Sequence, residues 1–368
     1  MLKLMRYLLK IRTHCFYHWY RIFKDRSALP EDAMTPILPS ELAFILGALR
    51  SGTTLLVRLI NNCKEMHATS EMFFYYPHLF SEKKDLTSTR NLLSLLYELN
   101  QFSDLKKDRW GLVNTILTEK TDPKKFYGLL NRRYRAKIID KVPDYAWYPK
   151  FFEELKRSNN RIGLIYIYRH PCAIANSFAK SIALEQKFNR KKKEGFKRYL
   201  GDYYQAPNFD LKLDRLDTVL DWCNFCWALT NHNILHYLKT NPEANYVLVP
   251  YEDLLTRPDF YYQAICDLFN IDYRECYLNL SNYYHSLPKW MLVKKLWRFD
   301  MPMGDPNQFD KKNSVIDGSR ATNYRRYGKY WDKSDDQTKA IAAQLGYTKS
   351  SHDPRMLSER LSILRAAS

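Results

Sequence analysis

The sequence has no run of about 18 consecutive apolar residues, although 45% of its 368 residues are hydrophobic. A helix that crosses a bilayer needs such a run, so we expect no transmembrane segment. No stretch is low in complexity, which indicates that the chain is folded throughout. The length allows one α/β domain with insertions. We expect this domain over residues 41–350, between an N-terminal helix and linker (1–40) and a C-terminal tail (351–368).

The sequence also lacks a second Cys-x-x-Cys pair that would complete a metal site with Cys223 and Cys226. Both cysteines lie within an apolar helical pattern, so we interpret them as thiols of the protein core. The chain has 7 cysteines, an odd number, and we expect no signal peptide before them. Both observations favour reduced thiols and a cytoplasmic protein.

Acidic residues are the scarcer charged class, with 40 Asp and Glu against 58 Lys and Arg and a formal net charge of +18. Such a charge favours an anionic partner: nucleic acid, an acidic membrane surface or an anionic small molecule. Residues 1–24 have one apolar and one basic helical face, although Arg12 interrupts the apolar face. This pattern is typical of a peripheral helix on an anionic membrane, and equally of a helix packed on the protein body. The basic run 187–198 contains aromatic residues and suits either an anionic ligand or a solvated loop.

Near the N-terminus, the sequence predicts a buried strand, a glycine turn and a helix in succession. Five apolar residues, Leu42–Leu46, are typical of a strand buried on both faces. The turn runs from Gly47 to Gly52, and apolar residues recur at helical spacing from Thr53. This geometry directs free backbone N–H groups and a helix N-terminus to one point, which suits a phosphate. An ordinary strand–turn–helix connection is the alternative.

The turn lacks the lysine of the nucleotide-binding P-loop. The spacing Gly47-x4-Gly52-Thr53-Thr54 fits the P-loop pattern, except that Thr53 stands where a lysine would reach the β and γ phosphates. A cation is present inside the turn as Arg50. The turn therefore suits an anionic group better than a metal-bound nucleoside triphosphate.

The turn resembles the 5′-phosphosulfate loop of the sulfotransferases that use 3′-phosphoadenosine 5′-phosphosulfate (PAPS). In that family a second element, a strand followed by an Arg and by a Ser eight residues later, holds the 3′-phosphate. Ile162–Tyr168, followed by Arg169 and Ser177, has the same pattern. The resemblance extends over roughly residues 42–269. It implies that the donor is bound by Arg50, Ser51, Gly52, Thr53, Thr54, Arg169 and Ser177.

Two further stretches resemble donor-binding elements of the same family. Tyr251 begins a Tyr-Glu-Asp-Leu sequence, in which the family's Tyr contacts the nucleotide. Residues 313–331 resemble the C-terminal loop that closes over the 3′-phosphate, although the spacing is loose. Within that loop we nominate Ser319, Arg320 and Arg325.

The resemblance also implies two catalytic residues. Glu71 lies 21 residues after Arg50, and at this spacing protein-tyrosine sulfotransferases and many relatives have a Glu that acts as general base. His67 is the alternative base, and a surface role for Glu71 is the other alternative. Lys141 ends a short strand and resembles the Lys of the family's Lys-x-Pro element. That Lys stabilises charge on the leaving phosphate; a lysine exposed to water at a strand end is the alternative.

The predicted fold is a three-layer α/β domain with a mainly parallel central sheet, including strands at Leu42–Leu46, Ile162–Tyr168 and Tyr246–Val249. The predicted reaction is in-line sulfuryl transfer from PAPS to a hydroxyl, leaving adenosine 3′,5′-bisphosphate and needing no metal. We favour a carbohydrate or glycolipid acceptor, with a protein tyrosine second.

Two other function classes compete with this prediction. A P-loop kinase would need a lysine at position 53 and an acidic metal ligand at the end of a strand, where the sequence has Arg169. A non-enzymatic basic module for membranes or nucleic acid would explain the net charge of +18. It would not explain Glu71 and Lys141 in addition to both donor elements.

Overall fold

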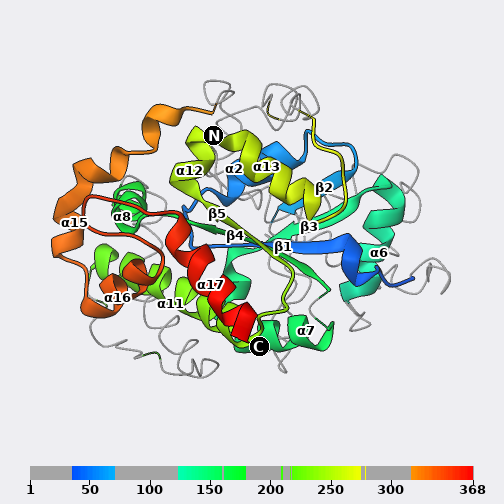
Figure 1. The fold of residues 1–368 in the computed structure, drawn as a ribbon, viewed down its shortest axis with the longest axis horizontal. Coiled ribbons are helices and arrows are strands. Elements are labelled where there is room, and N and C mark those ends of the chain that lie inside the picture. Colours follow the sequence, from blue (N-terminus) through cyan, green and yellow to red (C-terminus); the bar gives the residue numbers. More distant parts are fainter. Residues whose placement is uncertain are drawn as a thin grey trace, which may run out of the picture.

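The computed structural model describes residues 35–70, 123–159, 161–179, 209, 216, 218–274, 278 and 316–367. The predictions made for residues 1–24, Glu71 and residues 187–198 lie outside these ranges. Five described strands form one parallel sheet in the order β2-β3-β1-β4-β5 (Figure 1). The strands are β1 (Leu42–Leu46), β2 (Met66–Ser70), β3 (Lys137–Lys141), β4 (Gly163–Tyr168) and β5 (Tyr246–Pro250).

The composition of the strands follows their positions in the sheet. Every residue of the central strands β1 and β4 is buried, as expected for apolar strands covered on both faces. The edge strand β5 is partly exposed over its first three residues. The other edge strand, β2, has the mixed sequence Met-His-Ala-Thr-Ser, and the sequence analysis assigned no strand there.

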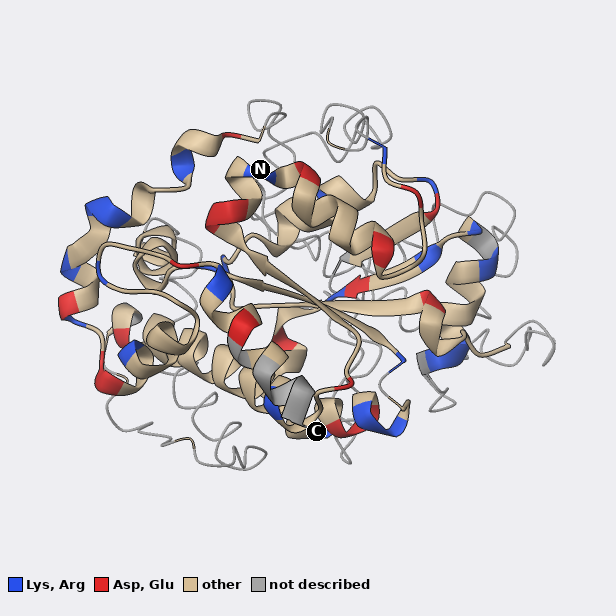
Figure 2. Cartoon of the chain, in the orientation of Figure 1, with Lys and Arg blue, Asp and Glu red and all other residues tan. Residues whose placement is uncertain are grey.

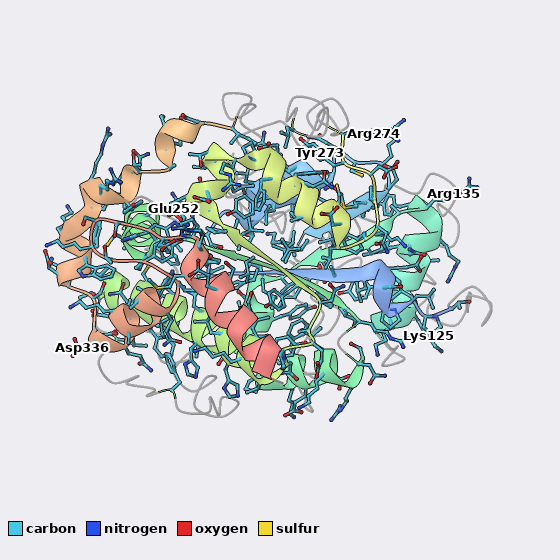
Figure 3. The ribbon with its side chains drawn as sticks, viewed as in Figure 1. Lys125, Arg135, Glu252, Tyr273, Arg274 and Asp336 are labelled. Carbon is cyan, nitrogen blue, oxygen red and sulfur yellow. The ribbon has the colours of Figure 1, made fainter. Side chains whose placement is uncertain are left out.

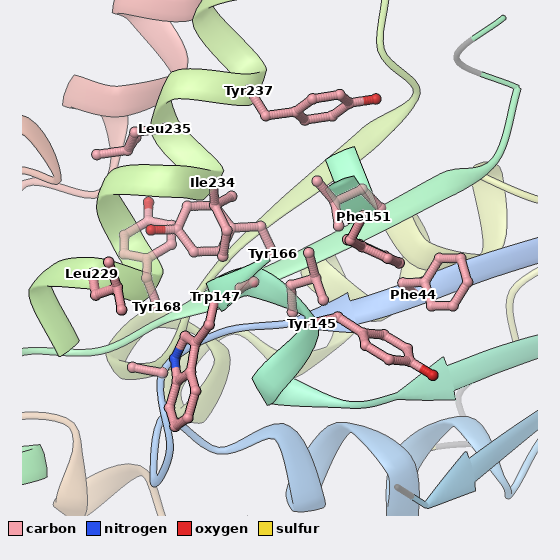
Figure 4. Close-up of a cluster of buried hydrophobic side chains, with 14 of the residues drawn as sticks. Phe44, Tyr145, Trp147, Phe151, Tyr166, Tyr168, Leu229, Ile234, Leu235 and Tyr237 are labelled. Carbon is pink, nitrogen blue, oxygen red and sulfur yellow. The ribbon is translucent and has the colours of Figure 1, made fainter. Parts of the chain in front are cut away.

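Helices cover both faces of the sheet, so the predicted three-layer α/β fold is confirmed. One face packs against α2 (Thr53–Ile60), α12 (Tyr251–Thr256) and α13 (Pro258–Asp267). The larger core, rich in aromatic rings, lies on the other face (Figure 4). Its helices are α6 (Pro123–Tyr134), α7 (Pro149–Arg157), α8 (Pro171–Ala179), α11 (Val219–Thr240), α16 (Asp336–Gln344) and α17 (Arg355–Ala367).

Helix α11 is shorter at its start than the sequence pattern indicated. The apolar spacing predicted a helix over residues 211–239, whereas the helix begins at Val219 and ends at Thr240. Thr218 and Asp221 form a capping box, in which the Thr218 hydroxyl accepts the Asp221 N–H at 3.1 Å. Cys223 and Cys226 are buried in the larger core, as the interpretation as core thiols predicted. Burial raises the pKa of both thiols.

The C-terminal part of the chain wraps around α8, α12 and α11. Two short 3₁₀ helices, η10 (Gly318–Arg320) and η11 (Asn323–Tyr327), are followed by α15 (Gly328–Asp332). Helix η10 packs on α12, whereas η11 and α15 pack on α8. Helix α17 lies within the segment 351–368 that the sequence assigned to a tail, and its Leu357 and Leu361 are buried in the larger core. No helix in the described ranges is both long and apolar enough to span a membrane.

Candidate functional site

The predicted site residues follow the carboxyl ends of neighbouring parallel strands. The glycine turn follows β1, Lys141 ends β3, Arg169 follows β4 and Tyr251 follows β5. Because β2 and β3 lie on one side of β1 and β4 lies on the other, the sheet has a topological switch point between β1 and β4. Ligands of open parallel sheets bind in the crevice at such a point.

The glycines of the turn are required by close packing. A Cβ atom at Gly47 would overlap the carbonyl oxygen of Ile167 in β4. A Cβ atom at Gly52 would overlap the ring of Tyr251, and Gly52 also has a φ of 106°, which favours glycine. Arg50, inside the turn, has a φ of 71° as well. The turn therefore rests directly on β4 and on the first residue of α12.

Contacts between side chains join the two predicted donor-binding elements. The Arg50 Nε donates to Ser177 Oγ of α8 at 3.0 Å, and Arg169 Nη1 donates to the Arg50 carbonyl oxygen at 3.0 Å. The Arg169 guanidinium carbon lies 4.0 Å from the centre of the Tyr251 ring. Four predicted residues from different parts of the chain, two of them arginines, are thus brought together.

Two buried polar atoms at this point have no hydrogen-bond partner within the described part of the chain. They are the Oγ of Ser51, a residue with 0% exposure, and the Nε of Arg169. Buried polar groups in proteins are nearly always paired, so each such atom needs an explanation. A hydroxyl and a guanidinium N–H beside a helix N-terminus fit the oxygens of a phosphate or sulfate group.

Lys141 is buried, with 1% exposure, which excludes the alternative of a lysine exposed to water. In the sheet it is paired with Ile45 of β1 on one side and with Ser70 of β2 on the other. Residues in register on parallel strands share a face, and Ile45 belongs to the core under α2. Lys141 therefore lies on the side of the sheet where the glycine turn leads into α2.

The two candidate bases lie at different distances along the chain from the carboxyl ends of the strands, where Lys141 is located. Glu71 lies outside the described residues, but it directly follows Ser70, which ends β2 in register with Lys141. His67 is paired with Ile138 and stacks on the ring of Tyr134 at 3.6 Å. His67 lies three positions before Ser70, about 10 Å along a strand. The structure thus places His67 away from the edge that carries Lys141.

Comparison with known proteins identifies the family. The sequence profile described as "Sulfotransferase family" matches residues 43–275, more than half of the chain. This chain belongs to the sulfotransferase family. No curated protein matches its sequence.

Two solved structures share the fold of this sulfotransferase. A sulfotransferase domain from the olefin synthase of Synechococcus PCC 7002 has a TM-score of 0.59 and 20% identity, and the match covers 88% of this chain and 99% of that one. A sulfotransferase domain from the curacin biosynthetic pathway has a TM-score of 0.57 and 21% identity, with the same coverage.

The three residues nominated near the C-terminus of this sulfotransferase contact residues of their own segment. The Ser319 hydroxyl and Arg320 Nε both donate to the carboxylate of Asp317, at 2.6 and 2.9 Å. Arg325 lies near the ring of Tyr324. Figure 2 shows the basic residues spaced along this segment, where Arg320, Arg325 and the neighbouring Arg326 are exposed. The segment is held against α12 and α8, which follow β5 and β4, so it borders the site.

Sequence reasoning did not single out a buried polar group behind Arg169. Glu252 of α12 accepts the backbone N–H of His170 at 3.0 Å and the hydroxyl of Tyr347 at 2.8 Å (Glu252 is labelled in Figure 3). Burial raises the pKa of Glu252, while the charge of Arg169 acts in the opposite direction. Burial lowers the pKa of His170 to about 4. Glu252 lies within the Tyr-Glu-Asp-Leu sequence and His170 directly follows Arg169, whereas Tyr347 lies in no motif.

Proposed function

We propose that this sulfotransferase transfers a sulfuryl group from PAPS to a hydroxyl acceptor. The observation that carries the proposal is the assembly of Arg50, Arg169, Ser177 and Tyr251 at the sheet's switch point. The Ser51 Oγ and the Arg169 Nε, which have no hydrogen-bond partner among the described residues, support a ligand with anionic oxygens there.

Each group has a role in the proposed donor complex. The backbone N–H groups of Gly52, Thr53 and Thr54, at the start of α2, and the hydroxyl of Ser51 suit the 5′-phosphosulfate. The Arg169 guanidinium and the Ser177 hydroxyl suit the 3′-phosphate, and Arg320 or Arg325 would close over it. The Tyr251 ring, already stacked on Arg169, limits where that guanidinium can turn.

In the proposed reaction, the acceptor oxygen forms a bond to sulfur while the bond between sulfur and the bridging phosphate oxygen breaks. The acceptor proton passes to the Glu71 carboxylate, and the electrons of the broken bond remain on the phosphate of adenosine 3′,5′-bisphosphate. Lys141, a buried cation, stabilises that developing charge. Its burial strengthens the effect, because few waters screen a charge that is removed from solvent.

For the acceptor we propose a carbohydrate or a glycolipid, with a protein tyrosine as the second candidate. The net charge of +18 supports an enzyme that works beside an anionic surface. The basic amphipathic pattern of residues 1–24 supports a peripheral position on a membrane facing the cytoplasm.

Calorimetric titration with three ligands tests the proposed donor class. We expect binding of adenosine 3′,5′-bisphosphate and much weaker binding of ATP–Mg²⁺ or an oligonucleotide. A preference for ATP–Mg²⁺ would favour a kinase, and binding of the oligonucleotide alone would favour a basic binding module. Transfer of radiolabelled sulfate from PAPS onto fractionated extracts would then identify the acceptor class.

A further inference from the structure

Four residues from three parts of the chain are linked by hydrogen bonds next to Arg169, at the carboxyl ends of β4 and β5. Glu252 accepts hydrogen bonds from the His170 N–H at 3.0 Å and from the Tyr347 hydroxyl at 2.8 Å. The His170 Nε2 lies 2.7 Å from the carbonyl oxygen of Thr348, the residue after Tyr347. We name His170, Glu252, Tyr347 and Thr348 the C-terminal clasp, because they attach the turn after α16 to the ends of β4 and β5.

The hydrogen bonds define the protonation of the His170 ring. The Cys172 N–H donates to Nδ1 of His170 at 3.2 Å, so Nδ1 is the acceptor and the proton is on Nε2. That Nε2–H then donates to the Thr348 carbonyl oxygen. The ring is neutral in this arrangement, and it also stacks on Tyr324 of η11 with 4.3 Å between the ring centres. His170 therefore contacts both the turn at Tyr347 and the segment that carries Arg320 and Arg325.

Glu252 is linked to Arg169 in two ways, through His170, which follows Arg169, and through Tyr251, which precedes Glu252. Its carboxylate binds the N–H of His170, which follows Arg169. Its preceding residue is Tyr251, whose ring lies 4.0 Å from the Arg169 guanidinium carbon. The Glu252 side chain thus sets the distance between the backbone that carries Arg169 and the ring on which Arg169 rests.

The Glu252 carboxylate receives a hydrogen bond from the turn after α16, through the hydroxyl of Tyr347. Glu252 is only 6% exposed, and a buried carboxylate is costly unless it is hydrogen-bonded. One oxygen is satisfied by His170, and the other by the hydroxyl of Tyr347, which has 1% exposure. Without that hydroxyl, Glu252 would lose its bond from the C-terminal turn and would be free to shift toward Arg169.

We propose that Glu252 and Tyr347 are positioning residues, which hold Arg169 in the orientation that receives the 3′-phosphate of the donor. The proposal rests on the proposed function, because it takes the donor to carry that phosphate. The same contacts couple donor binding to the packing of residues 318–352. When the hydrogen bonds of the C-terminal clasp are formed, Arg169 faces the ligand. When they are broken, Arg169 is free to turn toward Glu252.

The substitution Tyr347→Phe tests the proposal, and Tyr168→Phe is the matched control. Both tyrosines have 1% exposure and their rings are in edge contact, 6.1 Å apart. The Tyr347 hydroxyl bonds Glu252, whereas the Tyr168 hydroxyl has no partner within the described chain. Removing an unpaired buried hydroxyl should change little. Both variants therefore keep a buried aromatic ring, and only Tyr347→Phe removes a hydrogen bond of the C-terminal clasp.

Calorimetry with adenosine 3′,5′-bisphosphate and adenosine 5′-monophosphate supplies the decisive readout. For Tyr347→Phe we expect about tenfold weaker binding of the bisphosphate, as for one lost charged hydrogen bond, and less than about a twofold change for the monophosphate. Glu252→Gln should show the same selectivity, and Tyr168→Phe should bind both ligands as the unchanged protein does. Equal losses for the two nucleotides, or the same loss in Tyr168→Phe, would overturn the proposal in favour of a purely structural role.

Hydrogen exchange separates this proposal from the proposed function. In Tyr347→Phe we expect faster exchange in both peptides 170–175 and 346–352, with peptides of α2 unchanged. Faster exchange confined to 346–352 would show that the turn is not coupled to Arg169. If the unchanged protein binds neither nucleotide, the proposed donor is wrong, and the exchange experiment still decides the coupling. Tyr347→Phe carries the test alone if Glu252→Gln does not fold.

Discussion

Replacement of Arg169 by alanine tests the assignment of the 3′-phosphate site most directly. In the structure Arg169 makes a hydrogen bond to the Arg50 carbonyl oxygen at 3.0 Å and stacks on Tyr251 at 4.0 Å. Loss of these two contacts should lower the free energy of unfolding by about 1–3 kcal/mol. The Arg169 Nε is left for the ligand, because it has no partner within the described residues.

Arg169→Ala should weaken binding of adenosine 3′,5′-bisphosphate more than the substitution of any neighbouring residue. A hydrogen bond to a charged group is worth ~1.5–3 kcal/mol, which corresponds to roughly 10- to 150-fold weaker binding of adenosine 3′,5′-bisphosphate. Adenosine 5′-phosphosulfate lacks the 3′-phosphate and should lose much less. Ser177→Ala should show the same selectivity with a smaller loss, since Ser177 also accepts from Arg50 at 3.0 Å.

Isothermal titration at one fixed ionic strength measures both ligands, because salt screens interactions between charges. Arg169→Lys is the matched control: it keeps the positive charge but not the planar fork, so it should recover only part of the affinity. Equal losses for the two nucleotides in Arg169→Ala would refute the reasoning and place Arg169 outside the 3′-phosphate site. A melting temperature for each variant shows whether the loss reflects unfolding.

Three other predictions concern the chemistry and the N-terminal segment. Glu71→Gln should lower kcat about 10²–10⁴-fold with donor affinity nearly unchanged, and less so for acceptors of lower pKa, which need less help from a base. Wild-type turnover in Glu71→Gln for all acceptors would refute the assignment. Lys141→Met should weaken donor binding modestly and reduce kcat more, because charge grows on the leaving phosphate in the transition state; an equal effect on both would contradict that role. Deletion of residues 1–24 should reduce sedimentation with anionic vesicles and leave turnover of a soluble acceptor nearly intact; unchanged vesicle binding would favour a helix packed on the body.

The central strands and the turn between β1 and α2 could be predicted because their signals are local. Five consecutive apolar residues marked β1, and the spacing of two glycines marked the turn. β2 was missed because its sequence alternates small and polar residues with only one large apolar side chain. Its place as a strand depends on pairing with β3, a contact between segments that lie far apart in the sequence.

At the start of α11, helix capping and not apolar periodicity determines where the helix begins. Apolar spacing continued N-terminal to Val219, but the Thr218 side chain satisfies the backbone N–H of Asp221 and begins the helix there. Periodicity reports which face of a helix is buried, and it says less about where the helix begins.

By itself, the sequence determined the family, the glycine turn and the order of the arginines, because short motifs need only neighbouring residues. Only the tertiary structure decided that Arg50 meets Ser177, that Lys141 is buried and that His67 lies away from the strand ends. It also decided the contact of Tyr347 with Glu252, across 95 residues of sequence. Parallel strands that end at one edge bring such residues together, and this pairing follows from the packing of the whole sheet rather than from any single segment.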